Sequence, residues 1–462
     1  MNRSISQTKT ANRKAQRRAV QRSVKLLNII AVSVVFLICW FLYYGHQLVD
    51  PFDNKGNWVI VIIFALLYYS FAHLYSGFLI HLSKISELVY AQVLGALLSN
   101  LIIYLVISLL VRGFPNVLPL FFSFIVECVV IVAWCYFAHQ WYFKKFRPKK
   151  TMIVCEEREG LEQLIEAYGM DKHFNVIATP NAKACLNNGF EEIKDAEVVF
   201  LYGVVSHDRN KFLKYCIENE IVVYVIPRIG DVIMSSATNM HMFHLPMMML
   251  ERYNPTPEYL VIKRVADVVL SVFVLAVLSP LLIVIAIIIK CTDGGPVFYN
   301  QKRLTKDGKE FSVHKFRSMR VDAEKDGVAR LSTGENDPRI TPIGRFIRKC
   351  RIDEFPQLIN IIKGEMSIVG PRPERPEIAA QYEKDIPEFH LRLQAKAGLT
   401  GYAQVYGKYN TTPYDKLLMD LMYIAKPSFA EDVKIIFATI KILFLTDSTE
   451  GFHCEDVKEN VE

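Results

Sequence analysis

The chain has 462 residues, of which 52% are hydrophobic and 22% are charged, and its mean hydropathy is +0.20. This balance excludes both an ordinary water-soluble enzyme and a chain that lies wholly in lipid, so one part should lie in a membrane and another in water. The net charge of +7 fits membrane topology, and no nucleic-acid-binding motif is visible, so we expect no nucleic-acid partner. Nine irregularly spaced cysteines without a C-x-x-C pair support neither a disulfide framework nor a zinc site.

The first part of the chain predicts a membrane region. Residues 1–23 are strongly basic and are expected to be disordered, and residues 24–143 contain four apolar runs. Each run is near the ~20 residues that cross a bilayer as a helix. The runs are Val24–Tyr44, Trp58–Tyr75, Val89–Val111 and Leu118–Phe143. A second basic cluster, Lys144–Lys150, follows the last run, and the positive-inside rule therefore places both ends in the cytoplasm.

One acid, Glu127, lies inside the fourth apolar run. An ionisable residue at membrane depth marks either a working site or a neutral residue that is paired with a neighbouring helix. The sequence offers no clear partner for it, and both interpretations stay open.

Residues 150–250 predict a small Rossmann-like α/β domain. Short runs rich in Val and Ile, at Thr151–Cys155, Val198–Tyr202 and Ile221–Ile226, alternate with helix-like segments, which is typical of a parallel sheet. A dinucleotide site would need a glycine-rich turn after the first strand, but residues 155–160 read Cys-Glu-Glu-Arg-Glu-Gly. Carboxylates would repel a pyrophosphate there, so we interpret the domain as structural or regulatory.

The apolar run Val265–Ile289 is interrupted in its middle by Ser279-Pro280. Proline removes a backbone donor and clashes with the preceding turn, so a kink is expected, and the Ser279 hydroxyl can bond a carbonyl that the break leaves free. A kinked spanning helix and a re-entrant helix that enters and leaves by one face both fit. A fifth span would export everything after Lys290, which is soluble and built to bind phosphate. We therefore predict a re-entrant helix over 265–289, with its membrane break at Ser279 and Pro280.

The soluble part from Asp293 to Tyr423 combines basic clusters with paired carboxylates. The clusters include Lys315-Phe316-Arg317, Arg345–Arg348 and Pro371-Arg372-Pro373, and Arg forks match phosphate oxygens in a bidentate way. Asp353 and Glu354 stand side by side between these clusters. An ionised Asp can attack phosphorus, and one or two carboxylates with phosphate oxygens can hold Mg²⁺. From the residues alone, the pair can equally well be bound to surface arginines.

The order and spacing of these motifs resemble the bacterial sugar transferase family, the monotopic polyprenyl-phosphate glycosyl-1-phosphate transferases. The resemblance runs from Lys263 to about Leu445, and the N-terminal half looks like the family's long subtype, which precedes a mostly helical catalytic domain, here 258–450. The motifs that carry it are Lys263–Asp267, Ser279-Pro280, Gly295–Phe298, Lys315–Met319, Asp353–Leu358, Met366–Pro373, Gly398–Gly401 and Gln404–Gly407.

The resemblance implies a reaction. A cytoplasmic UDP-sugar would donate sugar-1-phosphate to polyprenyl phosphate, such as undecaprenyl phosphate, with release of UMP. This would be the first membrane step of exopolysaccharide, capsule, O-antigen or glycan synthesis. The family's pattern makes Asp353 the nucleophile through an aspartyl-phosphosugar intermediate and Glu354 its partner, with both residues at a Mg²⁺ ion. The substrate phosphates would meet basic residues at motif positions, namely Lys315, Arg317, Arg348, Arg372 and Lys408.

The resemblance also implies a place and partners. The chain would lie in a bacterial inner membrane, in contact with membrane lipid, with its catalytic domain on the cytoplasmic side, and some relatives form homodimers. Two departures from the family's pattern concern the identity of the donor sugar and not the reaction class. They are Lys396-Ala397-Gly398, where a basic residue, Pro and Gly are usual, and Tyr406-Gly407-Lys408, where Asn-Gly-Arg is common. The sugar and the pathway are not predicted.

Two other functions use the same residues. A membrane-bound phosphodiesterase that cleaves nucleotide sugars would use the same carboxylates with water as the acceptor. A non-catalytic membrane scaffold would keep the domain without its chemistry, although the intact Asp353-Glu354 pair argues against it. Near the C-terminus, Ala430–Leu445 has apolar residues at helical spacing, which fits either a helix at the membrane surface or one packed on the protein core.

Overall fold

A computed structural model of the chain describes residues 2–50, 52, 54–156, 160–253, 255–320, 339–407 and 411–443. These residues form two compact units, Met1–Ile226 and Pro227–Glu462, and each unit is described by itself.

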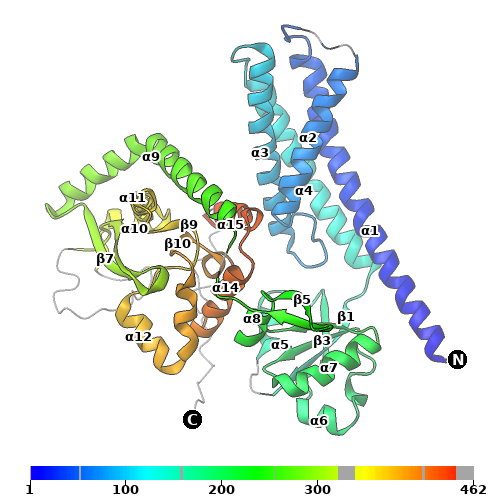
Figure 1. Ribbon diagram of the computed structural model, residues 1–462. Coiled ribbons are helices and arrows are strands. Elements are labelled where there is room, and N and C mark those ends of the chain that lie inside the picture. Colours follow the sequence, from blue (N-terminus) through cyan, green and yellow to red (C-terminus); the bar gives the residue numbers. More distant parts are fainter. Residues whose placement is uncertain are drawn as a thin grey trace. The chain divides into compact units, whose positions relative to one another are not determined.

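The first unit begins with a bundle of long helices (Figure 1). The bundle contains α1 (Asn2–Cys39) with a π-helical extension, η1 (Trp40–Tyr44), and then α2 (Asn54–Leu74), α3 (Ile85–Val111) and α4 (Leu118–Lys145). Each is long and apolar enough to cross a membrane, and large apolar side chains such as Leu66, Leu105 and Phe137 remain more than half exposed on the outside. Such an exposed apolar surface is typical of helices that face lipid.

The N-terminus differs from the sequence-based prediction. Residues 1–23 are expected to be disordered, but α1 extends over Asn2–Cys39 without interruption. The first 39 residues contain no Gly or Pro, and Ala, Arg, Lys and Gln are strong helix formers. The basic segment therefore continues the first apolar helix instead of preceding it as a disordered tail.

A buried polar network joins helices of the bundle. Glu127 on α4 is fully buried and accepts hydrogen bonds from Asn100 Nδ2 on α3 (2.7 Å) and from Ser123 Oγ (3.3 Å). Asn28 on α1 donates to Gln92 on α3 (3.1 Å) and accepts from the Tyr68 hydroxyl on α2 (2.8 Å). Polar contacts of this kind join membrane helices, so the structure favours the helix-paired interpretation of Glu127.

A small parallel sheet follows the bundle within the same unit. Its strands are β1 (Lys149–Cys155), β2 (Phe174–Ala178), β3 (Val198–Tyr202) and β4 (Val222–Val225), which pair in the order β2-β1-β3-β4. The connecting helices are α5 (Leu161–Ala167), α6 (Ala182–Asn187), η2 (Glu191–Ile193) and α7 (Ser206–Glu218). The parallel α/β sheet is as predicted, and β2 is the strand that the sequence pattern missed.

Glu156 fills the position where a parallel sheet of this kind commonly binds a ligand. The strand order reverses between β1 and β3, and ligands of open α/β sheets bind beyond the carboxyl ends of strands at such a point. The Glu156 side chain lies there, with Oε1 3.2 Å from Lys183 Nζ and Oε2 accepting from the Val205 backbone amide at 3.3 Å. The protein's own carboxylate thus uses the donors that an anionic ligand would need.

His173 makes the stability of the first unit depend on pH. Its side chain is buried, its ring lies 4.7 Å from that of Phe143, and burial lowers its pKa to about 4, with the nearby His139 and His81 lowering it further. The unfolded chain takes up this proton near pH 6.5, so stability is fully present above that pH and is lost as the pH falls from about 6.5 to about 4. The melting temperature of the detergent-solubilised protein should therefore fall between pH 7 and pH 5. His173→Phe, which keeps a ring against Phe143, should reduce this fall, and an unchanged pH profile would contradict the assignment.

The second unit is mostly helical, as predicted for the catalytic domain. Its helices are α8 (Ile229–Met234), α9 (Pro257–Asp293), η3 (Lys306–Gly308), α10 (Pro342–Lys349), η4 (Ile352–Glu354), α11 (Gln357–Lys363), α12 (Pro376–Asp385), η5 (Pro387–Gln394), α13 (Tyr402–Tyr406), α14 (Pro413–Ala425) and α15 (Phe429–Leu443). Three pairs of strands complete it: antiparallel β5 (Thr238–Met242) with β6 (Leu245–Met249), antiparallel β7 (Phe298–Leu304) with β8 (Glu310–Phe316), and parallel β9 (Ser367–Val369) with β10 (Gly398–Thr400).

Residues 227–250 group with the second unit and not with the α/β domain to which the sequence assigns them. The reason is apolar packing, because Val232 on α8 is 3% exposed and lies in the core formed by residues such as Leu358, Leu417 and Ile435. The same core includes α15, which packs on the protein through Ile435 and the buried Asp432. Of the two interpretations of this C-terminal helix, the structure supports packing on the core.

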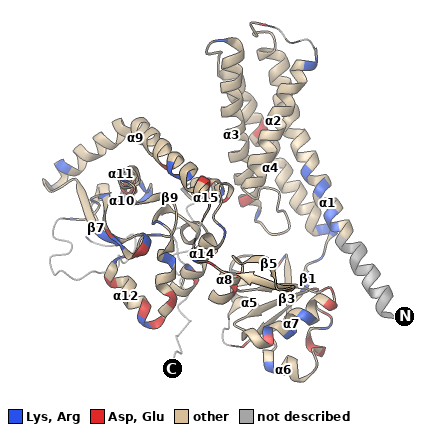
Figure 2. Ribbon diagram, in the orientation of Figure 1, with Lys and Arg blue, Asp and Glu red and all other residues tan. Residues whose placement is uncertain are grey.

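α9 is bent in its middle, and its two arms descend toward the same side (Figure 1). Pro280 lies inside the helix and cannot donate to the Ala276 carbonyl, and Ser279 Oγ donates to that carbonyl at 2.8 Å. This is the bond that the sequence predicts at the break. Most of α9 carries no charged residue, and Lys and Arg gather near its ends (Figure 2).

Both arms of α9 contact the same globular body. On the first arm, Arg264 donates to the Ile361 carbonyl at 2.6 Å. On the second arm, Ile285 and Ile289 are buried against a cluster that includes Phe316 and Ile347. The opposite surface of the helix is apolar and exposed along both arms, with Val261, Val269, Phe273, Val277, Ile283 and Ile287 each more than half exposed.

Candidate active site

The two adjacent carboxylates lie in a tight turn between two helices. α10 ends at Lys349, Arg351 adopts a left-handed conformation (φ 53°), and η4 then carries Asp353 and Glu354. Pro356, the N-cap residue of α11, follows them, so the pair is held between two helix ends. A left-handed residue that is not glycine is uncommon and costs free energy, which is frequent where a site needs a particular backbone direction.

Two cations from distant parts of the chain meet at Glu354. Lys315 Nζ, near the end of β8, lies 3.2 Å from Glu354 Oε1, and the Arg372 guanidinium, beyond β9, lies 3.4 Å from the same oxygen. Burial alone would raise the pKa of Glu354, but the charges of Lys315, Arg372 and Arg351 outweigh it and lower this pKa to about 2. Glu354 is therefore a fixed anion that holds the two cations in place.

Asp353 is different from its neighbour. Burial raises its pKa to about 6, the negative charge of Glu354 raises it further, and Lys315 and Arg348 act in the opposite direction. At neutral pH Asp353 is mostly ionised, and among the described residues it forms no ion pair, since Lys315 and Arg372 both pair with Glu354. A partly buried carboxylate that is not bound in an ion pair, among cations that can hold phosphate, is suited to attack an electrophilic phosphorus.

A metal ion at this site would be held by this pair of carboxylates. Among the described residues no group of three His, Cys, Asp or Glu side chains could hold a metal by itself. Mg²⁺ needs only one or two carboxylates when phosphate oxygens and water complete its shell. The mutual repulsion that raises the pKa of Asp353 is what a divalent cation would relieve. The residues present therefore fit Mg²⁺ that is bound together with a phosphate substrate.

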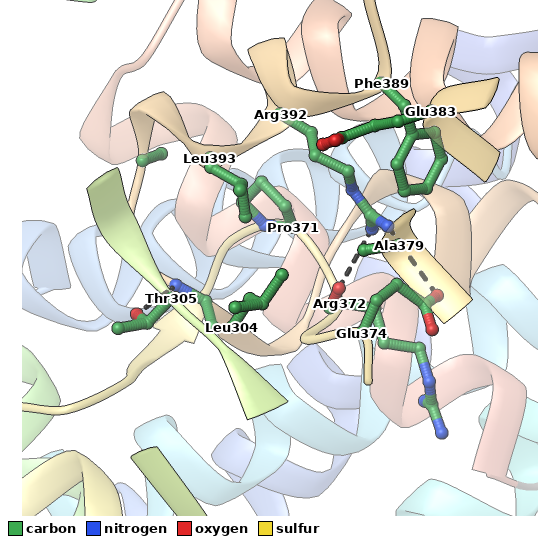
Figure 3. A pocket seen from close by; sticks show the side chains of 12 residues that line it. Leu304, Thr305, Pro371, Arg372, Glu374, Ala379, Glu383, Phe389, Arg392 and Leu393 are labelled. Atoms are coloured by element: carbon green, nitrogen blue, oxygen red, sulfur yellow. Dashed lines mark hydrogen bonds and ion pairs between the residues drawn. The ribbon is translucent and has the colours of Figure 1, made fainter. Parts of the chain in front are cut away.

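Arg372 is held on a rigid segment between Pro371 and Pro373. Two arginines bind the carbonyls of this segment: Arg392 donates to the Arg372 carbonyl at 2.9 Å, and Arg303 donates to the Pro373 carbonyl at 3.1 Å. Figure 3 shows the Arg392 side chain reaching this segment across a small pocket. Proline on both sides and two arginines behind the backbone fix the direction of the Arg372 side chain.

The two supporting arginines belong to a buried ionic network. Arg392 is 3% exposed, lies 2.6 Å from Asp420 Oδ2 and 3.6 Å from Glu374 Oε1, and Arg303 lies 3.8 Å from Glu374 Oε2. Removing one member of such a network leaves an uncompensated buried charge. Sequence reasoning missed the roles of Arg392, Asp420 and Glu374, because residues far apart in the chain gave no local signal of their pairing.

A close approach of two backbones explains the glycines of the neighbouring motifs. β9 and β10 pair in parallel, and a Cβ on Gly370 would collide with the Lys396 carbonyl, while one on Gly401 would collide with the Gly370 carbonyl. Only glycine allows the chain to cross here. The crossing lies directly before Arg372 and therefore helps to set the position of its side chain.

The structure brings together three of the five basic residues that the sequence predicts for substrate binding. The charges that shift the pKa values of the carboxylate dyad, Asp353 and Glu354, include Lys315, Arg348 and Arg372. Arg317 is buried, and its role in substrate binding stays a prediction. Lys408 lies outside the described residues, so its predicted role stays a prediction.

Arg372→Lys is expected to lower catalytic efficiency although it keeps the positive charge. Lysine has no planar fork, and the loss of one charge-assisted hydrogen bond costs about 1.5–3 kcal/mol, or roughly tenfold to 150-fold in rate. The measurement is kcat/KM of the purified variant for a phosphate-bearing substrate, with the exposed Lys363→Arg as a control for the exchange of the two residue types. An Arg372→Lys variant with unchanged efficiency would remove Arg372 from the substrate contacts.

Comparison with known proteins places this site in a family. Residues 258–446 match the model of the family described as "Bacterial sugar transferase". The chain is 36% identical over 236 residues to the UDP-N-acetylgalactosamine-undecaprenyl-phosphate N-acetylgalactosaminephosphotransferase of Aeromonas hydrophila, covering 50% of this chain and 55% of that one. It is 42% identical over 184 residues to the UDP-glucose:undecaprenyl-phosphate glucose-1-phosphate transferase of Escherichia coli K12, covering 39% of each chain.

These two alignments span about half or less of the relatives' length. A third relative is covered almost completely: the exopolysaccharide production protein PSS of Rhizobium leguminosarum is 41% identical over 190 residues, which are 39% of this chain and 94% of that protein. The match to the family model, residues 258–446, includes Asp353, Glu354 and the cations around them. The chain therefore belongs to the bacterial sugar transferase family.

Proposed function

We propose that the protein is a phosphoglycosyl transferase, which moves sugar-1-phosphate from a UDP-sugar to a polyprenyl phosphate such as undecaprenyl phosphate. The observation that carries the proposal is the unequal carboxylate pair. Glu354 is bound by Lys315 and Arg372, whereas Asp353 has its pKa raised to about 6 and remains available to react. The names of the relatives supply the donor and acceptor classes, since two of them name a UDP-sugar together with undecaprenyl phosphate.

The reaction would take place in two displacements. The Asp353 carboxylate attacks the phosphorus that carries the sugar, and the bond from this phosphorus to the nucleotide oxygen breaks, so UMP leaves with the electron pair. A phosphate oxygen of the polyprenyl phosphate then attacks the same phosphorus. The bond to Asp353 breaks, the carboxylate is restored, and a lipid-linked diphosphosugar is formed. No proton has to move when the attacking and leaving groups are ionised.

The residues around the dyad have separate tasks in this scheme. Arg372, mounted between two prolines, and Lys315 bind phosphate oxygens of the donor and neutralise the charge that develops on them. Glu354 orients both cations, as its distances of 3.4 and 3.2 Å indicate. Arg348, which favours the charged form of Asp353, keeps the nucleophile ionised. Mg²⁺ bound to Asp353 and Glu354 would supply further charge neutralisation at the transferred phosphate.

The same proposal places the domain at the cytoplasmic surface of a bacterial inner membrane. α9 would enter the membrane and return to the same side, because Arg264 on one arm and Ile289 on the other contact the same globular body. The apolar outer surface of α9 would face lipid, and the dyad would lie near the headgroups, where the phosphate of a polyprenyl acceptor is found. The four helices of the first unit would be the remaining membrane spans.

A panel of radiolabelled UDP-sugars tests the proposal. Each would be incubated with purified protein, undecaprenyl phosphate and Mg²⁺, and the organic phase would be extracted and counted. Label in the organic phase with one or a few sugars, dependent on undecaprenyl phosphate, is expected and would identify the donor. Label that stays in the aqueous phase for every sugar would contradict the proposal.

A further inference from the structure

The first arm of α9 is bound to the catalytic body by directed polar contacts. Arg264 uses both terminal nitrogens of its guanidinium, one to the Ile361 carbonyl at 2.6 Å and the other to the Ile362 carbonyl at 2.7 Å. These carbonyls lie in the last turn of α11, where a cation complements the helix dipole. α11 begins at Gln357, three residues after Glu354, so this contact holds the helix that directly follows the two carboxylates.

Asp267 makes the corresponding contact to the other half of the site. Its side chain is 7% exposed, Oδ2 accepts from Ser367 Oγ at 2.7 Å, and Oδ1 accepts from the Ile368 backbone amide at 3.1 Å. Both partners are on β9, and the chain continues from β9 through the close crossing at Gly370 to Arg372. One carboxylate on α9 therefore holds two successive residues of the strand that leads to Arg372.

A third contact supports the same strand. Lys263 lies 2.8 Å from Asp432 Oδ2 and donates to the Tyr423 hydroxyl at 3.1 Å. The Tyr423 hydroxyl lies 3.3 Å from the Val369 carbonyl, the last carbonyl of β9. The strand is thus tied to α9 at Ser367 and Ile368 and through Tyr423 at Val369.

These contacts do more than fasten the helix. Apolar packing can hold a helix against a domain while tolerating small slides and rotations, whereas paired hydrogen bonds fix both. Burying a carboxylate costs free energy unless its oxygens accept hydrogen bonds. Asp267 is therefore stable only where both of its partners on β9 are in place, which suits it to define a position. A strand only three residues long has few ladder bonds of its own to resist displacement.

We propose that Asp267 is a positioning residue for catalysis, which acts through β9 on Arg372. The position of α9 against the catalytic body is thereby coupled to the reaction with the nucleotide sugar. The inference rests on the proposed function. When α9 is correctly seated, Asp267 holds Ser367 and Ile368, and Arg372 meets Glu354 and the donor phosphate. When the contact is lost, the helix stays in the membrane but the arginine is displaced.

A double-mutant cycle tests this coupling. The full-length protein in lipid nanodiscs would be assayed for kcat and KM toward the UDP-sugar that the parent accepts. Asp267→Ala should lower kcat/KM by about tenfold or more in the parent background but by less than about threefold in an Arg372→Lys background, because coupled residues are not additive. Asp267→Asn, which keeps one acceptor oxygen, should recover part of the loss.

Two controls keep the test decisive. Glu258→Gln changes an exposed carboxylate on the same helix and should leave kcat/KM unchanged. Ser367→Ala removes only the hydrogen bond from the Ser367 hydroxyl to Asp267, so it can replace Asp267→Ala if that variant does not fold. Its loss of kcat/KM should be smaller, and it should also decrease in the Arg372→Lys background. Equal losses in both backgrounds, or no loss in the parent background, would overturn the inference. A parent protein that transfers no sugar phosphate would overturn the proposed function itself.

Discussion

Asp353→Asn is expected to abolish sugar-phosphate transfer while leaving the protein folded. An amide nitrogen or oxygen cannot replace an anionic carboxylate as a nucleophile, so the loss should reach on the order of 10³-fold or more in kcat. The side chains are nearly equal in size, and Asp353 is not an ion-pair partner of Lys315 or Arg372, both of which contact Glu354. The measurement is turnover of the purified variant, with its melting temperature as the test of folding.

Asp385→Asn provides the matched control, because Asp385 is an exposed acid at the end of α12 and should tolerate the same exchange without loss. The two variants together separate a chemical effect from a general effect of lost charge. Near-normal turnover of folded Asp353→Asn would remove Asp353 from the nucleophile role.

Replacing both Ser279 and Pro280 with Leu is expected to straighten α9 and to carry the segment after it across the membrane. Without proline, Ala276 would recover its helical bond partner, and a straight apolar helix of this length is long enough to span. The test uses a variant cleared of native thiols, with a single cysteine introduced by Lys309→Cys in the exposed turn between β7 and β8. A membrane-impermeant reagent on intact cells should label this position only in the straightened variant.

The control for this experiment is a cysteine introduced by Lys55→Cys near the start of α2, on the side that the positive-inside rule places outside the cell. It should be labelled in both backgrounds. Labelling of the Lys309→Cys variant from outside with Ser279 and Pro280 intact would contradict the re-entrant arrangement, and the cytoplasmic position of the dyad with it.

Local signals in the sequence anticipated much of the fold. The apolar runs, the Ser279-Pro280 break and the strands at Val198–Tyr202 and near Thr151 each depend on short-range patterns, and the structure has them where they were predicted. The continuation of α1 to its N-terminus was missed because charge suggested disorder, whereas helix propensity and the absence of Gly and Pro decided the outcome. β2 was missed because Phe174–Ala178 is short and half exposed.

The sequence motifs indicated the centre of the candidate site but not the residues that support it. Asp353, Glu354 and Arg372 stand in compact motifs, and the structure brings Glu354 and Arg372 together. The residues that hold them lie far away in the chain: Arg392 is 20 residues from Arg372, and Asp267 is 100 residues from Ser367. Such pairings depend on how helices and strands pack, which no local pattern records. They also determine whether the reactive groups are placed well enough to act.

The most direct test of the proposed transfer is the release of UMP with and without polyprenyl phosphate. Purified protein, Mg²⁺ and the accepted UDP-sugar would be mixed, and UMP would be followed over many turnovers. We predict at most about one UMP per active site without the lipid, from the first displacement alone, and continuous release once the lipid is added. Steady release without lipid would indicate a phosphodiesterase that uses water as the acceptor. No release with any UDP-sugar would indicate a non-catalytic scaffold, and either result would contradict a transferase.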